Sequence, residues 1–266
     1  MSPPAHRAML KRQLARAGRV CAAHGLTVLI YHRVGGGTPD ERDVPIAEFQ
    51  RHVGRLRDTR VLSLDAALDE LAAGDDRPKV VITFDDGFAD VATAALPILT
   101  EHGLPFTLYL TTAYVGQTMH WDGSTATAGG PALTWDQVGA LVDSGLCTLG
   151  NHTHTHAAPD RLTTDELDRC TAEVRARAGV TPMHFAYPWG VPVPRMDRAV
   201  RERFRSAATG EVGRSHPGVD PLHLRRVPVR ASDPLPFFEA KISGSLLPEH
   251  TYSVLVRAAK GVGLRA

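Results

Sequence analysis

Short apolar segments alternate with amphipathic segments along most of this chain, and that alternation limits its possible folds more than any other feature. Buried strands are expected at residues 27–31, 79–84, 106–110, 183–187 and 205–209. Amphipathic helices are expected at residues 64–73 and 90–102, and in two segments that follow the capping residues Thr134 and Thr163. Strand–helix alternation of this kind predicts a parallel α/β sheet, either open or closed into a barrel.

The length and composition favour a single globular domain. A barrel of strands and helices with 266 residues is ordinary, and 43% hydrophobic with 22% charged residues is typical of a folded chain. We expect a basic helical segment at 1–25, one α/β domain at 26–242 and a C-terminal tail at 243–266. The net charge of +1 gives no reason to expect a nucleic-acid partner. The sequence does not indicate an oligomeric state.

The N-terminal segment bears on where the protein works. Residues 6–20 contain five basic residues and no acidic one, so this segment can pack on the domain as a helix or contact an anionic membrane surface at its periphery. No apolar run is long enough to span a bilayer, and a signal-peptide core is missing. Cys21, Cys147 and Cys170 lack CxxC spacing and suit a reducing compartment. We therefore expect a cytoplasmic protein that can associate with a membrane surface.

Polar side chains follow three of the expected strands. Asp85 and Asp86 come after the apolar residues 80–82, and residues 187–190 follow the strand expected at 183–187. Residues 151–156 follow the short apolar stretch 146–149, which we also expect to be a buried strand. Parallel α/β folds place their sites at the carboxyl ends of strands, so we expect these three clusters to converge on one face.

Carboxylate and imidazole groups at such a face favour a divalent metal site with an adjacent general base. One carboxylate and two imidazoles hold a metal ion and leave positions open for water and substrate. His152 with His156 is one candidate pair, and His152 with His154 is another. Of two adjacent aspartates only one usually faces a given metal, so the other is free to orient or deprotonate water. The pattern predicts a metal-dependent hydrolase.

The motifs resemble those of the NodB-homology polysaccharide deacetylases, a family of carbohydrate esterases. The likeness rests on LIYHRV at 29–34, TFDDG at 83–87, HTHTH at 152–156 and FAYPWG at 185–190, and it extends over residues 26–242. The resemblance implies a distorted (β/α) barrel. It also implies a hydrolase of non-peptide carbon–nitrogen bonds that removes acetyl groups, most often from N-acetylated sugars and glycans.

The resemblance also assigns roles to individual residues. It implies that Asp86, His152 and His156 ligate the metal ion, while His154 does not, and that Asp85 is the general base. Zinc is the expected ion, although cobalt and nickel accept the same ligands. The family further implies an oxyanion contact from the backbone N–H of Trp189 and a sugar-binding surface. In this chain Tyr187 and Trp189 would border the sugar. Independently of the family, the long loop 111–133 is expected to form an active-site lid that offers Trp121 to a sugar ring, the alternative being a solvent loop whose tryptophan packs down.

Two positions depart from the family pattern. Many relatives have an arginine in the third motif that orients the base aspartate, whereas this chain has Ala186. Arg225 or Arg226 can fill that role, and we favour Arg226. The late motif that supplies the general acid is also incomplete, so His223 and His32 are both candidates for protonating the leaving group.

Other functions fit the same residues less well. Some relatives of this fold hydrolyse cyclic amides or imides, and a chain with altered motifs can be a glycan-binding module without catalysis. The histidines can also be solvated loop residues beside capping aspartates. The substrate depends on loops 33–45, 111–133 and 210–224, and we expect an acetylated intermediate in the cytoplasm or at the membrane surface rather than a mature wall polymer.

Overall fold

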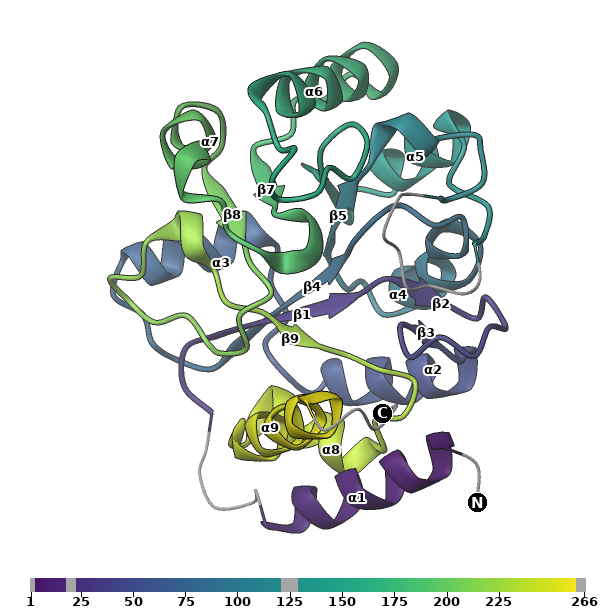
Figure 1. Cartoon of the computed structure of the whole chain (residues 1–266), viewed down its shortest axis with the longest axis vertical. Coiled ribbons are helices and arrows are strands. Elements are labelled where there is room, and N and C mark those ends of the chain that lie inside the picture. Colours follow the sequence, from purple (N-terminus) through teal and green to yellow (C-terminus); the bar gives the residue numbers. More distant parts are fainter. Residues whose placement is uncertain (1–2, 18–22, 121–128, 262–266) are drawn as a thin grey trace.

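The computed structural model describes residues 3–17, 23–120 and 129–261. Within these residues, seven parallel strands form one sheet in the order β8-β7-β6-β5-β4-β1-β9 (Figure 1). The strands are β1 (Leu26–Tyr31), β4 (Lys79–Phe84), β5 (Phe106–Leu110), β6 (Cys147–Asn151), β7 (His184–Ala186), β8 (Ser206–Ala208) and β9 (Val227–Pro228). A separate short pair, β2 (Arg33–Val34) with β3 (Asp43–Val44), extends from the end of β1.

The segment around β9 brings the two edges of the sheet together. Leu224 bridges Ala208 of β8, and three residues later Val227 pairs with Leu29 of β1. The sheet therefore curls into a half-barrel that is closed only along this short connection. The expected α/β fold and distorted (β/α) barrel are confirmed.

Helices surround the sheet in Figure 1. They are α1 (Pro3–Ala17), α2 (Ile46–Leu56), α3 (Leu64–Ala72), α4 (Leu96–Glu101), α5 (Trp135–Asp143), α6 (Thr164–Ala178), α7 (Asp197–Arg203), α8 (Leu235–Ser243) and α9 (Leu247–Gly261). The predicted caps form: Thr134 and Gln137 make a capping box on α5, and the Thr163 side chain accepts from the N–H of Glu166 on α6. The helix expected at 90–102 begins instead with a wider π-helical turn, Val91–Ala95, before α4.

Side chains alternate between two apolar cores along the strands, as the period of a β-strand requires. One set packs around α3 inside the curl of the sheet: Leu26, Val28, Val81, Tyr109, Ala186, Ala208 and Leu224. The intervening residues of β1, β4 and β5 face a larger core that includes residues of α2, α5, α6 and α8. Because the inner core fills the middle of the curl, polar groups at the strand ends remain available for a site.

The two terminal helices pack on each other and on α8. Ala15 of α1 lies in a small core with Phe237 and Tyr252. Lys11 is fully buried there, and its Nζ lies 2.6 Å from the Asp233 carboxylate. The helix expected within 1–25 thus packs on the domain, and the segment expected as a tail contains α9. In the described parts of the chain, none of the helices is long and apolar enough to cross a bilayer.

Candidate functional site

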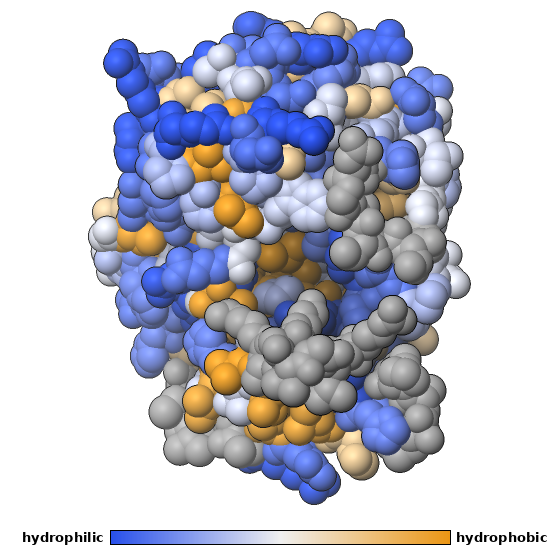
Figure 2. Space-filling model, in the orientation of Figure 1, coloured by the Kyte–Doolittle hydropathy of each residue, from blue (hydrophilic) through white to orange (hydrophobic). Residues whose placement is uncertain are grey.

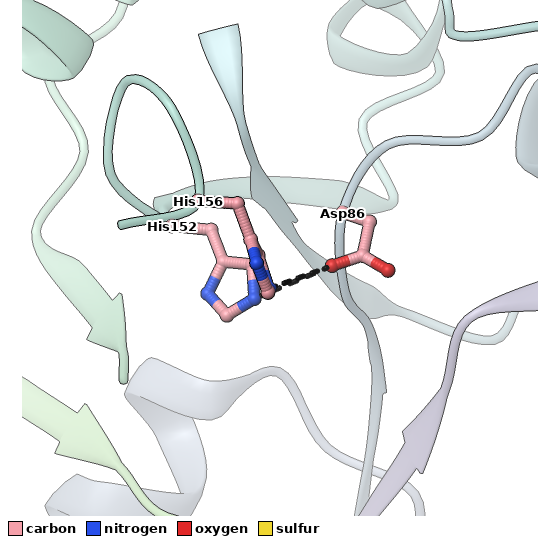
Figure 3. Close-up of side chains that lie close together, drawn as sticks. All are labelled: Asp86, His152 and His156. Carbon is pink, nitrogen blue, oxygen red and sulfur yellow. Dashed lines mark ion pairs between the residues drawn. The ribbon is translucent and has the colours of Figure 1, made fainter. Parts of the chain in front are cut away.

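Three potential metal ligands converge at the carboxyl ends of β4 and β6 (Figure 3). Asp86 lies two residues beyond β4, and its Oδ1 is 3.5 Å from the Nε2 of His152 and 3.5 Å from the Nε2 of His156. One donor atom from each residue lies within 4.8 Å of the others, and all three residues are buried. This spacing allows all three atoms to surround a single ion, and it brings together the pair His152 and His156.

An unusual backbone conformation places these side chains. Asp86, Thr153 and His156 all have positive φ, at 74°, 68° and 56°, a conformation that non-glycine residues rarely adopt. The side chain of Asn151 fixes the turn, since its Oδ1 accepts a hydrogen bond from the N–H of Thr153 at 2.8 Å and its Nδ2 donates to the Leu167 carbonyl at 2.9 Å. Strain of this kind costs on the order of 1–3 kcal/mol per residue and persists where surrounding contacts enforce it.

The two histidines both direct their Nε2 atoms at Asp86. His152 lies with its Nδ1 2.8 Å from the Ala186 carbonyl, which can only accept, so Nδ1 carries a proton and Nε2 faces Asp86. Burial lowers the pKa of His152, but its hydrogen bond with Asp86 and the charges of Asp85 and Asp86 outweigh burial, and the pKa is raised overall. Burial lowers the pKa of His156 to about 4, which keeps its ring neutral at pH 7. Burial alone would raise the pKa of Asp86, but its hydrogen bond with His152 and the nearby histidine charges hold it well below the usual range.

His154, the middle histidine of the turn, has other partners. Its Nδ1 lies 2.9 Å from the Thr112 hydroxyl, and its Nε2 lies 2.9 Å from the Arg169 guanidinium. Both ring nitrogens therefore contact residues outside the group that contains Asp86.

A buried ion pair adjoins the ligand group. Asp85 accepts a hydrogen bond from Nη1 of Arg226 at 2.7 Å, and the two side chains are only 5% and 1% exposed. Arg226 is held in turn by the Thr209 carbonyl, which accepts from its Nε at 2.9 Å, and by the ring of Tyr109. Burial raises the pKa of Asp85, but Arg226 and His152 outweigh burial, and the pKa is lowered overall. Asp85 is thus a fixed, ionised carboxylate.

The three potential metal ligands and the pair of Asp85 and Arg226 line one pocket of about 260 Å³. Ile30, His32, Arg42, Trp189, Gly190 and Gly210 complete its walls. The Trp189 ring lies 5.3 Å from that of His156. Figure 2 shows a hollow near the centre of one face, with apolar and polar atoms in its walls. The turn that carries Trp189 is tight: φ is 63° there and 68° at Gly190, where an added Cβ would lie 2.6 Å from the Cα of Gly210.

The other residues predicted for the site lie in different places. His32 lines the pocket, and among the described residues its buried Nδ1 has no hydrogen-bond partner. His223 does not line the pocket; it is 43% exposed and 3.6 Å from the Asp220 carboxylate. The Tyr187 side chain is buried against Phe185 at 4.8 Å between ring centres, away from the pocket lining. Trp121 lies outside the described residues.

One charged residue of the pocket, Arg42, was not predicted as a site residue from the sequence. It belongs to the loop between β2 and β3, within the segment 33–45 on which the substrate was expected to depend, although no single residue of that segment was predicted to contact it. Its neighbour Asp40 was the one available signal, because an Asp-x-Arg spacing allows the carboxylate to hold the guanidinium. Of the two arginines considered for the base, Arg226 reaches Asp85, whereas Arg225 pairs with Glu211 at 3.0 Å.

Comparison with known proteins agrees with the family that the sequence motifs resemble. A sequence model of the family described as polysaccharide deacetylase matches residues 72–207. YxkH of Bacillus subtilis strain 168, provisionally named a polysaccharide deacetylase, is 28% identical over 144 residues, which are 52% of this chain. The match spans 46% of YxkH, so this chain covers about half the length of that curated relative.

Solved structures share the fold. IcaB from Ammonifex degensii is 28% identical with a TM-score of 0.67, over 78% of this chain and 92% of that chain. The Streptococcus pyogenes deacetylase PplD, solved in complex with acetate, has a TM-score of 0.68 at 19% identity, over 84% of this chain and 99% of that chain. At 19% identity the second likeness concerns the fold alone.

Proposed function

This chain belongs to the polysaccharide deacetylase family, and on that premise we propose that it hydrolyses the N-acetyl group of an acetylated amino sugar or glycan with the help of a divalent metal ion. The observation that carries the proposal is the convergence of Asp86, His152 and His156 on the pocket that also contains the Asp85–Arg226 pair.

The donor set fits a catalytic metal ion. Two imidazoles and one carboxylate suit zinc, and also cobalt or nickel, and three protein ligands leave a position for water or substrate. The contact between His152 and the Ala186 carbonyl is the kind of outer contact that fixes a ligating imidazole. When bound, such an ion polarises the acetyl carbonyl and increases the acidity of water.

Asp85 acts as the general base in this proposal. Its carboxylate stays ionised because Arg226 lies 2.7 Å away, and it lies next in sequence to the ligand Asp86, so it is positioned to accept the proton of the attacking water. The charge of Arg226 is paired with Asp85 and does not act on the substrate directly. The guanidinium orients the Asp85 carboxylate, and the Thr209 carbonyl holds the guanidinium in place. Arg226 thus takes the orienting role that the third motif of this chain lacks.

The remaining steps fall to Trp189 and His32. The backbone N–H of Trp189, on the strained turn at the pocket wall, donates to the oxyanion that develops on the acetyl carbonyl. Its ring is 40% exposed and borders the sugar. His32 lines the pocket while His223 does not, so we assign protonation of the leaving amine to His32.

The test combines metal content with acetate release. We expect nearly one zinc or similar ion per chain in the wild type and in His154→Gln, the matched control from the same turn, and loss of the ion in His156→Ala. Acetate release from N-acetylglucosamine oligomers should be lost in Asp85→Asn while its metal content is retained. A wild-type chain that binds no metal after reconstitution, or a His156→Ala chain that keeps it, would overturn the metal site.

A further inference from the structure

The loop between β2 and β3 is braced by its own carboxylates. Asp43 accepts hydrogen bonds from the N–H of Gly36 at 2.8 Å and from the N–H of Thr38 at 2.7 Å. The loop is also tied to the rest of the domain, since the Glu41 carbonyl accepts from the N–H of Ala231 at 2.7 Å. A loop held at both ends and in its middle has a defined conformation, although glycines occupy three of its positions, 35–37.

This loop carries Arg42 to the pocket. Asp40 accepts from Nε of Arg42 at 3.0 Å and from Nη2 at 2.8 Å, and it also accepts from the backbone N–H of Arg42 at 2.9 Å. One carboxylate thus fixes both the backbone and the guanidinium. The Arg42 side chain is 33% exposed, and the residue lines the pocket that contains Asp86, His152 and His156. Two of the five guanidinium N–H groups bond to Asp40, which leaves the others for a ligand.

The charges of the pocket indicate what kind of ligand these groups bind. Asp40 balances the charge of Arg42, just as Asp85 balances that of Arg226. Neither guanidinium contributes an unbalanced positive charge that would favour a phosphate or a carboxylate over a neutral group. A fixed guanidinium with a neutralised charge is instead a rigid hydrogen-bond donor.

We infer that Arg42 is a specificity-determining residue that donates hydrogen bonds to hydroxyl oxygens of an uncharged acetylated sugar. The inference rests on the proposed deacetylation, and it narrows the substrate class to neutral amino sugars and their oligomers. A rival role is purely electrostatic, with Arg42 acting on Asp86 and His32 across the pocket. The two roles differ in one respect: sugar recognition depends on the hydroxyls of the substrate, whereas an electrostatic effect changes every hydrolysis at this site.

The experiment compares two substrates in the metal-loaded full chain. N-acetylglucosamine oligomers offer sugar hydroxyls, and p-nitrophenyl acetate offers the acetyl group without them. For Arg42→Ala we expect a roughly tenfold larger loss in kcat/KM on the oligomers than on the aryl ester, carried mainly by KM, as one or two lost hydrogen bonds predict. Arg42→Lys should recover only part of it, because lysine cannot reproduce the fork. Arg225→Ala removes a guanidinium that pairs with Glu211 outside the pocket, and this variant should match the wild type.

Equal losses on both substrates would overturn the recognition role in favour of the electrostatic one, and an unchanged KM for the oligomers would overturn it outright. A defect that grows for phosphorylated sugars would show that Arg42 recognises an anion and would overturn the assignment to neutral hydroxyls. Oligomer binding to Asp85→Asn, with and without Arg42→Ala, separates the two proposals. If the wild type releases no acetate, the deacetylase proposal fails, while a tenfold weaker binding of the double variant would still support Arg42, and equal binding would refute it.

Discussion

Replacing Arg226 with methionine tests the central feature of the site, the buried pair of Arg226 and Asp85. Methionine matches much of the arginine stem in size but removes the guanidinium that lies 2.7 Å from the Asp85 carboxylate. The carboxylate, only 5% exposed, then keeps its charge without its partner. The Thr209 carbonyl also loses the N–H that it accepts at 2.9 Å.

The burial of this pair sets the size of the expected loss in stability. Removing one partner of a buried ion pair costs about 3–5 kcal/mol, because the other charge remains uncompensated. For a chain of this size, about 2–4 °C of thermal midpoint corresponds to each kcal/mol, so we expect the Tm to fall by on the order of 10 °C. Acetate release should fall by roughly 100-fold or more, because the base loses its fixed orientation.

A double-mutant cycle in the free energy of unfolding provides the assay. Arg226→Met and Asp85→Asn each leave one group of the pair alone, and the double variant removes both charges. We therefore expect the loss in the free energy of unfolding of the double variant to be smaller than the sum of the two single losses, by about 2 kcal/mol or more. Arg225→Met, the same substitution one residue earlier at a half-exposed ion pair, should change stability by less than about 0.5 kcal/mol. Strictly additive losses, or an Arg226→Met chain that melts like the wild type, would refute the reasoning.

Three further predictions concern other parts of the fold. Lys11→Met leaves buried Asp233 with Lys241 but without its α1 partner, and we expect a loss of about 2 kcal/mol in urea denaturation. Burial lowers the pKa of His52 to about 4 in the native state, so the stability provided by its neutral ring is complete above pH 6.5 and is lost as the pH falls towards 4. His52→Gln should remove about 3 kcal/mol of this acid-dependent loss, as measured by urea denaturation at successive pH values. Gly190→Ala places a Cβ against the backbone at positive φ, and we expect a loss of about 2 kcal/mol or more in thermal unfolding.

Each of these predictions has a result that contradicts it. Wild-type stability in Lys11→Met would mean that Lys241 alone satisfies the Asp233 carboxylate. An unchanged pH dependence in His52→Gln would assign the acid sensitivity to other groups. A Gly190→Ala chain that unfolds at the wild-type temperature would mean that the turn at Trp189 relaxes without cost.

Strand ends were the most predictable part of the molecule. Apolar segments mark β4 and β6 clearly, and parallel strands bring their carboxyl ends to one edge, so the convergence of Asp86 with residues 151–156 follows from the order of the segments. The choice between His154 and His156 does not follow from spacing. It depends on two residues of the turn with positive φ, Thr153 and His156, which are stabilised by tertiary contacts that a local pattern does not contain.

Which arginines reach the site was also hard to predict from the sequence, because their positions depend on contacts between distant parts of the chain. Arg225 and Arg226 are adjacent, and only the path of the chain between Leu224 and Val227 decides which side chain faces into the barrel. Arg42 lies in a loop without apolar periodicity, so its position depends on tertiary contacts rather than on a repeating pattern. Arg42 bonds to Asp40, and the loop is held by the hydrogen bonds that Asp43 accepts from the N–H groups of Gly36 and Thr38.

The separate bracing of the loop between β2 and β3 has an evolutionary consequence. The groups proposed for catalysis follow β4 and β6, whereas Arg42 is fixed mainly by its own loop neighbour Asp40. Under the role proposed for Arg42, substitutions within this loop alter which acetylated molecules fit while the hydrolytic apparatus stays intact. A lineage can diversify its substrates through this one short loop. Related chains that differ there should then differ in the acetylated substrate they prefer and catalyse the same reaction.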